Sequence, residues 1–326
     1  MTTNREWLNI TAEEYHLYPA VSSGGLKCYE KKGPLEYHAM YIAKTKLNED
    51  TTAKRMGTAF HKAMEDPDSW QTGYVLRPTE ATDALLIAKV EAMISEHSSA
   101  EAPKLGEKLN MRKKFHKAYV ELMEQEAVAD GKVMLTSDEY DIIDLQIAAV
   151  YDNVVCREVV GQKTRTNVEM ACVAECSKTG VMIKALTDLL VGDVIVDFKT
   201  TKAANAYEFC RDAMDMGYRF QAAHYLHVTG CTEFRFLSVT SQASLKTGSH
   251  CEANLWRVPD KVIREAHEKN IQTLGSIKSN LKAAGDDTMD CQGVPYAWHN
   301  NDWNAELPLD TNYFLNDELD PELVGF

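Results

Sequence analysis

The chain has 326 residues, of which 44% are hydrophobic and 26% are charged, and its 49 acidic residues outnumber 35 basic ones to give a net charge of −14. This length and composition are typical of a globular protein with one large or two moderate domains, and they exclude a small disulfide-stapled scaffold. No window approaches the roughly 18 apolar residues of a membrane span, and residues 1–30 lack an apolar run of signal-peptide length. We therefore expect a soluble, cytoplasmic protein with no membrane partner.

The negative charge is unevenly distributed along the chain. Residues 285–326 contain ten acidic residues and no lysine or arginine, so the remaining chain carries only −4 (−14 plus 10). A balanced body can still bind a polyanion if basic residues line the surface that meets it. Five basic residues with no acidic residue between them are candidates for DNA binding: Lys108, Arg112, Lys113, Lys114 and Lys117. A helix face that is simply solvated explains this cluster of charges equally well.

The first half of the chain shows mainly helix signals. A capping box at Thr11–Glu14 predicts one short helix, and the segment beginning at Ser22 predicts a second. Apolar residues recur at helical spacing from about Ala53, and again between residues 83 and 152. We expect residues 1–165 to be mostly helical.

Strand signals begin after Thr166, where the apolar period changes to two and stays so through Thr201. The pattern then predicts a helix over residues 205–227, strands over 233–240 and 253–258, and a long amphipathic helix over 259–284. The second half should therefore combine a sheet with flanking helices.

The turn at Gly192-Asp193 aligns acidic residues across the predicted strands. A two-residue hairpin turn there pairs Val191 with Val194, and counting back along both strands places Asp188 opposite Asp197. The preceding turn, read with either a two-residue or a four-residue loop, places Glu169 opposite Asp188. Because side chains alternate along a strand, Lys199 should share the face of Asp197.

Like charges directly opposite one another destabilise a sheet unless something neutralises them. A divalent cation would do so, and oxygen ligands beside a lysine suit Mg²⁺ or Mn²⁺ better than zinc. The alternative is an exposed sheet face with solvated acids. The density of Val, Ile and Leu around the acids favours a sheet that is buried on both faces, and hence a metal.

Several segments together resemble a known nuclease family. One segment is similar to the core motif of the PD-(D/E)XK nuclease superfamily. In it, Asp188 is followed after eight residues by Asp197-Phe-Lys199, and Thr187 stands in place of the motif's proline. Gly57-Thr-Ala-Phe-His61 resembles the GTAxH motif of RecE-type exonucleases (exodeoxyribonuclease VIII) of phages and prophages, and Tyr218–Tyr225 resembles a later motif of that family. The resemblance covers roughly residues 8 to 300.

This resemblance implies a fold, an α/β (α+β) PD-(D/E)XK core with a central mixed sheet flanked by helices. A single nuclease domain would span residues 1–284, with a helical part over 1–165 and the catalytic sheet with its helices over 166–284, and residues 285–326 would be an acidic extension.

The resemblance also implies roles for individual residues. Asp188 and Asp197 would bind the metal, joined by His61, and Glu169 would bind or orient it. Lys199 would orient or deprotonate the attacking water. Gln221 and Tyr225, which share a helix face at i, i+4, would lie beside that lysine. A histidine on a helix is commonly structural, as we expect of His224 and His227, but the motif around His61 favours a ligand.

The activity implied is a metal-dependent 5′ to 3′ exonuclease on linear double-stranded DNA that exposes 3′ single strands for recombination, acting with a single-strand annealing recombinase and as a homo-oligomer. Two alternatives stay open from the residues. One is another nuclease of the same fold, either an endonuclease or a single-strand exonuclease. The other is a non-catalytic DNA-binding or host-interaction protein, which the complete set of acids and lysine disfavours.

Overall fold

The computed structural model describes most of the chain outside two long segments and the last residues. The described residues are 2–46, 51–66, 70, 73–77, 117, 120–121, 123–127, 129–203, 205–240 and 251–284. The five candidate DNA-binding cations between residues 108 and 117 are called here the basic cluster. Outside the described residues lie the acidic extension 285–326 and four members of this cluster, Lys108, Arg112, Lys113 and Lys114.

The chain divides into two compact units. One consists of Met1–Asp50 and Ala149–Phe326 and is called here the sheet unit; the other, Thr51–Ala148, is called the smaller unit. The expected single domain over 1–284 stays a prediction.

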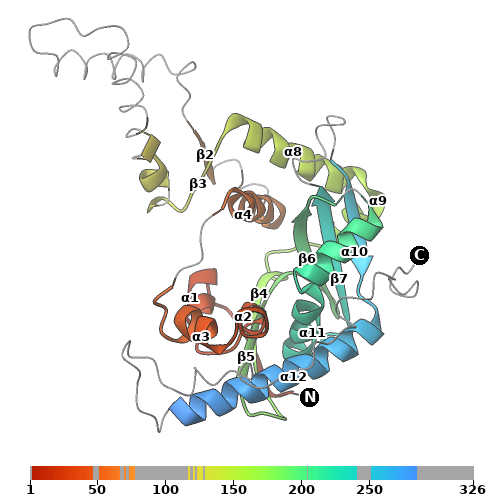
Figure 1. The fold of residues 1–326 in the computed structure, drawn as a ribbon. Coiled ribbons are helices and arrows are strands. Elements are labelled where there is room, and N and C mark those ends of the chain that lie inside the picture. Colours follow the sequence, from red (N-terminus) through yellow and green to blue (C-terminus); the bar gives the residue numbers. More distant parts are fainter. Residues whose placement is uncertain are drawn as a thin grey trace, which may run out of the picture. The chain divides into compact units, whose positions relative to one another are not determined.

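A six-stranded mixed sheet is the centre of the sheet unit (Figure 1). Its strands lie in the order β1-β4-β5-β6-β7-β8; β6 and β7 are parallel, and the other neighbours are antiparallel. The strands are β1 (Thr2–Leu8), β4 (Val168–Cys176), β5 (Met182–Val191), β6 (Val194–Thr201), β7 (Glu233–Thr240) and β8 (Ala253–Arg257). This arrangement confirms the predicted α+β fold with a central mixed sheet.

Helices of the sheet unit come from both ends of the chain. They are α1 (Ala12–Leu17), α2 (Ser23–Lys32), α3 (Pro34–Tyr37), the π-helix η1 (His38–Ile42), α9 (Val154–Val160), α10 (Ala206–Asp215), α11 (Tyr218–Thr229) and α12 (Asp260–Ala284). Helix α11 packs on β4 and β5 and contacts both α2 and α12, so that α2 and α12 cover the outer side of α11 (Figure 1).

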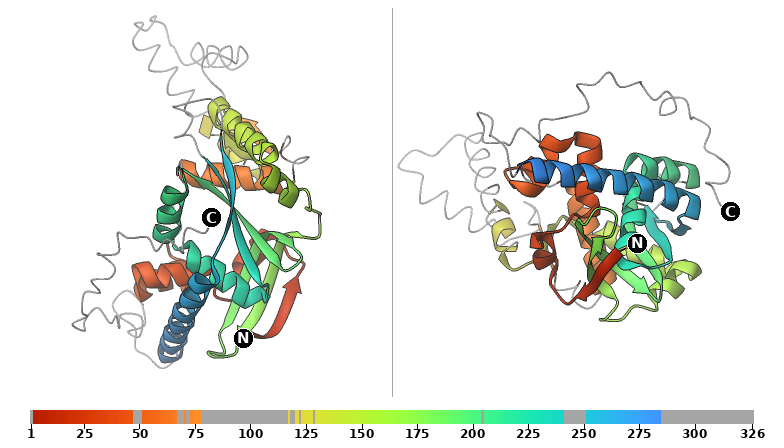
Figure 2. Two further views of the ribbon diagram at one scale, coloured as in Figure 1. Left: turned by 90° about the vertical axis from the view of Figure 1, so that its right-hand side faces the viewer. Right: turned by 90° about the horizontal axis from the view of Figure 1, so that it is seen from below.

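The sheet is covered on both faces at the strand that carries the predicted acid and lysine. Four consecutive residues of β6, Ile195 to Phe198, are at most 2% exposed. Since side chains alternate along a strand, consecutive burial requires cover on both faces. The solvated-face alternative therefore fails for Asp197. Strand β1, by contrast, lies at the edge of the sheet (Figure 2), and most of its residues are exposed.

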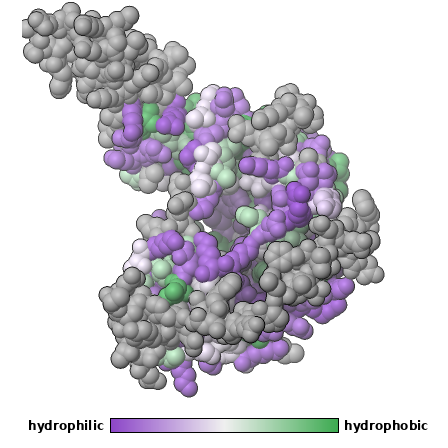
Figure 3. Space-filling view, in the orientation of Figure 1, coloured by the Kyte–Doolittle hydropathy of each residue, from purple (hydrophilic) through white to green (hydrophobic). Residues whose placement is uncertain are grey.

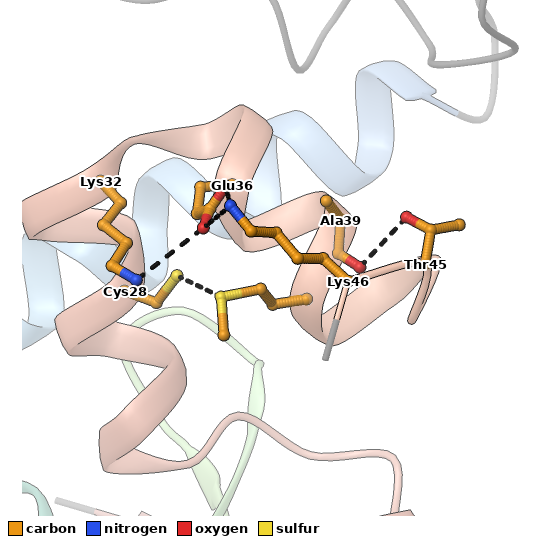
Figure 4. Close-up of polar contacts among 7 residues, drawn as sticks. Cys28, Lys32, Glu36, Ala39, Thr45 and Lys46 are labelled. Atoms are coloured by element: carbon orange, nitrogen blue, oxygen red, sulfur yellow. Dashed lines mark hydrogen bonds and ion pairs between the residues drawn. The ribbon is translucent and has the colours of Figure 1, made fainter. Parts of the chain in front are cut away.

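Local contacts explain the ends of the N-terminal helices. The Thr11 side chain and Glu14 form the predicted capping box of α1, and the Ser22 hydroxyl accepts from the backbone N–H of Gly25 at the start of α2. Glu36 pairs with Lys46 at 2.7 Å and with Lys32 at 3.8 Å, which ties α2, α3 and the segment after η1 together (Figure 4).

Two features of this unit differ from the sequence predictions. The helix expected over residues 205–227 is two helices, α10 and α11, because Gly217 adopts a left-handed conformation between them (φ +66°). Strand β1 was not expected either. Its side chains are mostly exposed and polar, and it belongs to the sheet through backbone pairing with β4.

The smaller unit is built on helices with a short sheet. It contains α4 (Thr52–Glu65), the parallel strands β2 (Tyr74–Leu76) and β3 (Val133–Leu135), and most of α8 (Ser137–Asp152). Its core includes Ala59 and Ala63 of α4 and Ile143 of α8. Thr136 and Glu139 form a capping box at the start of α8.

Hydrophilic side chains predominate among the coloured residues on the face drawn in Figure 3, and apolar ones are scattered. None of the helices in the described part of the chain is both long and apolar enough to cross a membrane.

Candidate active site

Asp188 and Asp197 lie at the same level of two neighbouring strands. Strands β5 and β6 pair Val191 with Val194 and Leu189 with Val196, and the pairing ends there. The register predicted from the Gly192-Asp193 turn is confirmed over these pairs, and continuing it by one position places Asp188 at the level of Asp197.

The Asp197 carboxylate is buried and has two polar partners. The residue is 2% exposed. Its Oδ1 accepts a 2.6 Å hydrogen bond from Nε2 of Gln221, and its Oδ2 forms an ion pair with Lys199. A charge-assisted hydrogen bond and an ion pair in a low-dielectric interior hold the carboxylate in one orientation.

Asp188 is half-buried and is oriented by the neighbouring strand. Its Oδ2 accepts a 2.6 Å hydrogen bond from the backbone N–H of Phe198, one residue beyond Asp197 on β6. Each carboxylate is therefore held by its own partners, Asp197 by Gln221 and Lys199 and Asp188 by the backbone of Phe198.

Lys199 is a cation held between acids and aromatic rings. Its side chain is 16% exposed, and its ammonium lies 5.2 Å from the ring centre of Tyr218 and 5.8 Å from that of Phe236. Burial alone would lower the pKa of Lys199, but the charges of Asp197 and Asp188 outweigh it, so the pKa is raised above its ordinary value. Lys199 is therefore charged at neutral pH.

Gln221 and Tyr225 lie one turn apart on α11, and both are buried, at 7% and 8% exposure. Burial raises the pKa of Tyr225 well above its ordinary value, helped by the nearby Tyr15, Asp197 and Asp188, while a hydrogen bond with Gln221 opposes the shift. The Tyr225 phenol therefore stays protonated, and Gln221 links it to Asp197. That both side chains lie beside Lys199 stays a prediction.

Glu169 departs from the predicted row. The pairing of Val168 with Leu189 and of Met170 with Thr187 puts Glu169 at the level of Asp188, as predicted. Its backbone, however, is left-handed (φ +46°), and the residue is exposed. A left-handed residue interrupts the alternation of an extended strand. Among the described residues, the oxygens of Glu169, Asp188 and Asp197 do not form a group within 4.8 Å of one another, so the expected line of three carboxylates is incomplete.

His61 belongs to the smaller unit. It lies on α4, half-buried, and Glu65 follows one helical turn later on the same face. Glu65 is not among the ligands expected from the sequence, although its spacing from His61 places the two side chains one helical turn apart.

Lys117 is the described member of the basic cluster. Its side chain is 80% exposed and lies 3.7 Å from Glu121, one turn along the same helix. This geometry fits a solvated helix face and also leaves the ammonium accessible to a phosphate.

Lys27 is a residue near this site that sequence reasoning missed. It is half-buried on α2, and the charges of both Lys199 and Asp197 act on it.

The sequence profile described as the PD-(D/E)XK nuclease superfamily matches residues 20–264, well over half of the chain. The chain belongs to the PD-(D/E)XK nuclease superfamily. As a nuclease of this superfamily it has a DNA substrate and uses a divalent metal. The motif residues Asp188, Asp197 and Lys199 occupy adjacent strands of its sheet.

Two solved structures show a distant likeness to this nuclease. One is the crystal structure of a phage related exonuclease from Haemophilus somnus 129PT, at 13% identity over 69% of this chain and 93% of that chain, with a TM-score of 0.30. The other is the crystal structure of SSO0001, at 17% identity over 63% and 92% of the two chains, with a TM-score of 0.24. No curated protein matches the chain. Membership of the superfamily rests on the match over residues 20–264.

Proposed function

We propose that this nuclease is a metal-dependent 5′ to 3′ exonuclease that degrades linear double-stranded DNA and leaves 3′ single strands for recombination of the phage type. The observation that carries the proposal is the buried Asp197 carboxylate, held by Gln221 and Lys199 beside Asp188. The resemblance of Gly57–His61 and Tyr218–Tyr225 to RecE-type motifs supports the polarity and the duplex substrate.

The donor atoms of the sheet unit fit a hard divalent cation. Asp188 and Asp197 offer carboxylate oxygens, which Mg²⁺ and Mn²⁺ prefer. His61 is proposed as a further ligand, Glu65 as its partner on the same helix face, and Glu169 as an accessory acid. When bound, the metal supplies an acidified water and neutralises charge on the phosphoryl oxygens.

The chain's own groups then have separate tasks. Gln221 and Lys199 hold the Asp197 carboxylate, and the Phe198 backbone N–H holds Asp188. Lys199 stays charged because of the two acids, so its ammonium orients the attacking water and the phosphate by donating hydrogen bonds. Tyr225 keeps Gln221 in place through the hydrogen bond between them.

A cleavage assay tests the activity. Linear duplex DNA labelled at either its 5′ or its 3′ end is digested with Mg²⁺ and with EDTA, beside a covalently closed circle of the same sequence. We expect Mg²⁺-dependent early release of the 5′ label and an intact circle. Cleavage of the circle would indicate an endonuclease, and preference for single strands a single-strand exonuclease. Lack of cleavage of any substrate with Mg²⁺ or Mn²⁺ would favour a non-catalytic DNA-binding role.

Matched variants connect the activity to the site. Lys199→Met should lose most turnover and keep metal binding in a calorimetric titration, whereas Lys202→Met, an exposed lysine three residues further on, should behave as the wild type. His61→Ala should weaken metal binding. We further propose that the enzyme acts as a homo-oligomer and delivers its 3′ strands to a single-strand annealing recombinase, which light scattering and a pull-down with the recombinase would test.

A further inference from the structure

Lys27 sits on α2 against the helix that carries Gln221. A Cβ atom placed on Gly217, the residue before α11, would lie 3.3 Å from Cδ and 3.7 Å from Cγ of Lys27. The aliphatic stem of Lys27 therefore packs on the glycine at the start of α11, and α2 and α11 are in contact (Figure 1). Tyr218, the next residue, carries the ring beside the Lys199 ammonium.

Lys27 and Lys184 differ in the polar contacts of their ammonium groups. In the part of the chain that the structure describes, the Lys27 ammonium forms neither a hydrogen bond nor an ion pair. Lys184 provides the contrast, because its buried ammonium donates to the carbonyl oxygens of Tyr15 at 2.6 Å and Tyr18 at 2.8 Å. Lys184 thus has a structural task at the end of α1, and Lys27 has none of this kind.

The electrostatics of Lys27 reflect this position. The pKa of Lys27 is lowered to about 8, chiefly by burial and then by the positive charge of Lys199, while Asp197 opposes the shift. The charge of Asp197 thus acts on both lysines, and Asp188 acts on Lys199 as well. A half-buried cation without a partner is costly, and an anion would remove that cost.

We propose that Lys27 binds a phosphate oxygen of the DNA substrate beside the Asp197–Lys199 pair. This inference rests on the proposed action on DNA and adds a substrate contact from α2. The phosphate is either an internal phosphodiester next to the scissile bond or the phosphate at a 5′ end, since both present the same anionic oxygens.

DNA binding without metal tests the contact separately from catalysis. Duplexes with a 5′-phosphate or a 5′-hydroxyl, labelled at the 3′ end, are titrated by fluorescence anisotropy in EDTA over a range of salt. Lys27→Met keeps the stem on Gly217 and removes the charge; we expect about tenfold weaker binding at low salt, the size of one charged hydrogen bond. The log–log salt slope should fall by about 0.9. Lys27→Arg should retain binding, and Lys32→Met, an exposed lysine on the same helix, should leave it unchanged.

The outcomes distinguish an internal phosphodiester from a 5′ phosphate as the group that Lys27 binds. They also distinguish failure of the Lys27 contact from failure of the proposed exonuclease activity. A loss confined to the 5′-phosphate duplex assigns Lys27 to the end, and an equal loss on both duplexes assigns it to an internal phosphate. Unchanged affinity and slope in Lys27→Met, or in Lys27→Gln if the first variant is misfolded by circular dichroism, would overturn the inference even if the wild type cleaves DNA. Conversely, a wild type that binds through Lys27 but does not cleave would overturn the proposed exonuclease and leave the contact standing.

Discussion

Nε2 of Gln221 donates a 2.6 Å hydrogen bond to Oδ1 of Asp197 in the interior of the sheet unit. Groups that orient a metal ligand typically contribute about 10–100-fold to metal affinity or activity. Gln221→Leu should therefore lower both the affinity for Mg²⁺ and the turnover by about that factor, measured by calorimetry and by digestion of linear duplex. Thr229→Val, a buried change on the same helix that removes a bond to the Tyr225 carbonyl, is the control and should leave both nearly unchanged. A Gln221→Leu enzyme with normal metal affinity and rate would refute the orienting role.

Asp188→Asn and Asp197→Asn should both abolish cleavage, yet differ in their effect on the metal-free fold. Asp197 is the buried counter-charge of Lys199, so its neutralisation leaves that ammonium uncompensated. Breaking a buried pair in this way costs about 3–5 kcal/mol. Asp188 is half-buried, and its asparagine oxygen can still accept from the Phe198 N–H. Urea unfolding in EDTA should thus show a large loss of stability for Asp197→Asn and a small one for Asp188→Asn. Equal losses would contradict the pairing of Lys199 with Asp197.

The register of the central strands was predictable because a two-residue turn fixes it. Once Val191 pairs with Val194, the pairs Leu190 with Ile195 and Leu189 with Val196 follow, and the same register leads on to Asp188 and Asp197. Strand β1 was not predictable in this way, because an exposed edge strand has no apolar alternation and gains its place from backbone pairing alone. The break at Gly217 was missed because a single glycine inside a helical pattern is commonly tolerated.

The parts of the candidate site that were predictable are those in which sequence spacing determines the face to which a side chain points. Alternation along β6 placed Lys199 with Asp197, and an i, i+4 spacing placed Gln221 with Tyr225. The same reasoning assumed an extended backbone at Glu169, and its positive φ invalidates that assumption. Lys27 joins the site only through the packing of α2 on α11, which local spacing does not encode.

His224 should make the protein less stable in acid. Its ring is fully buried on α11, and Nε2 donates to the carbonyl oxygen of Lys184 at 3.0 Å. The pKa of His224 is lowered from 6.5 to about 4, chiefly by burial; hydrogen bonds with the backbone oppose the shift, and the nearby His227 and His267 add to it. Because the folded-state pKa is the lower one, the unfolded chain binds more protons between about pH 4 and 6.5. Stability is therefore full above that window and falls as the pH drops through it.

The measurement is the free energy of unfolding by urea at pH 7 and at pH 4.5. The His224 share of the loss should be about 2–3 kcal/mol. His224→Gln retains an N–H donor but does not titrate, so it should lose that much less than the wild type between the two pH values. An unchanged pH dependence in His224→Gln would show that another group governs acid unfolding.

The basic cluster should contribute to DNA affinity in proportion to the phosphates that it contacts. Lys117 is 80% exposed, and its pairing with Glu121 at 3.7 Å is of the surface type that contributes little, so a phosphate can displace the glutamate. Replacing Arg112, Lys113, Lys114 and Lys117 with glutamine should reduce the log–log salt slope of duplex binding by up to about 3 to 4, since each contact contributes about 0.9.

The control is a second quadruple glutamine variant, which removes the same net charge from exposed lysines elsewhere: Lys32, Lys44, Lys178 and Lys282. If both variants lower the slope equally, the cluster is a solvated helix face and only the total charge matters; a larger drop in the first variant locates the DNA path along residues 112–117.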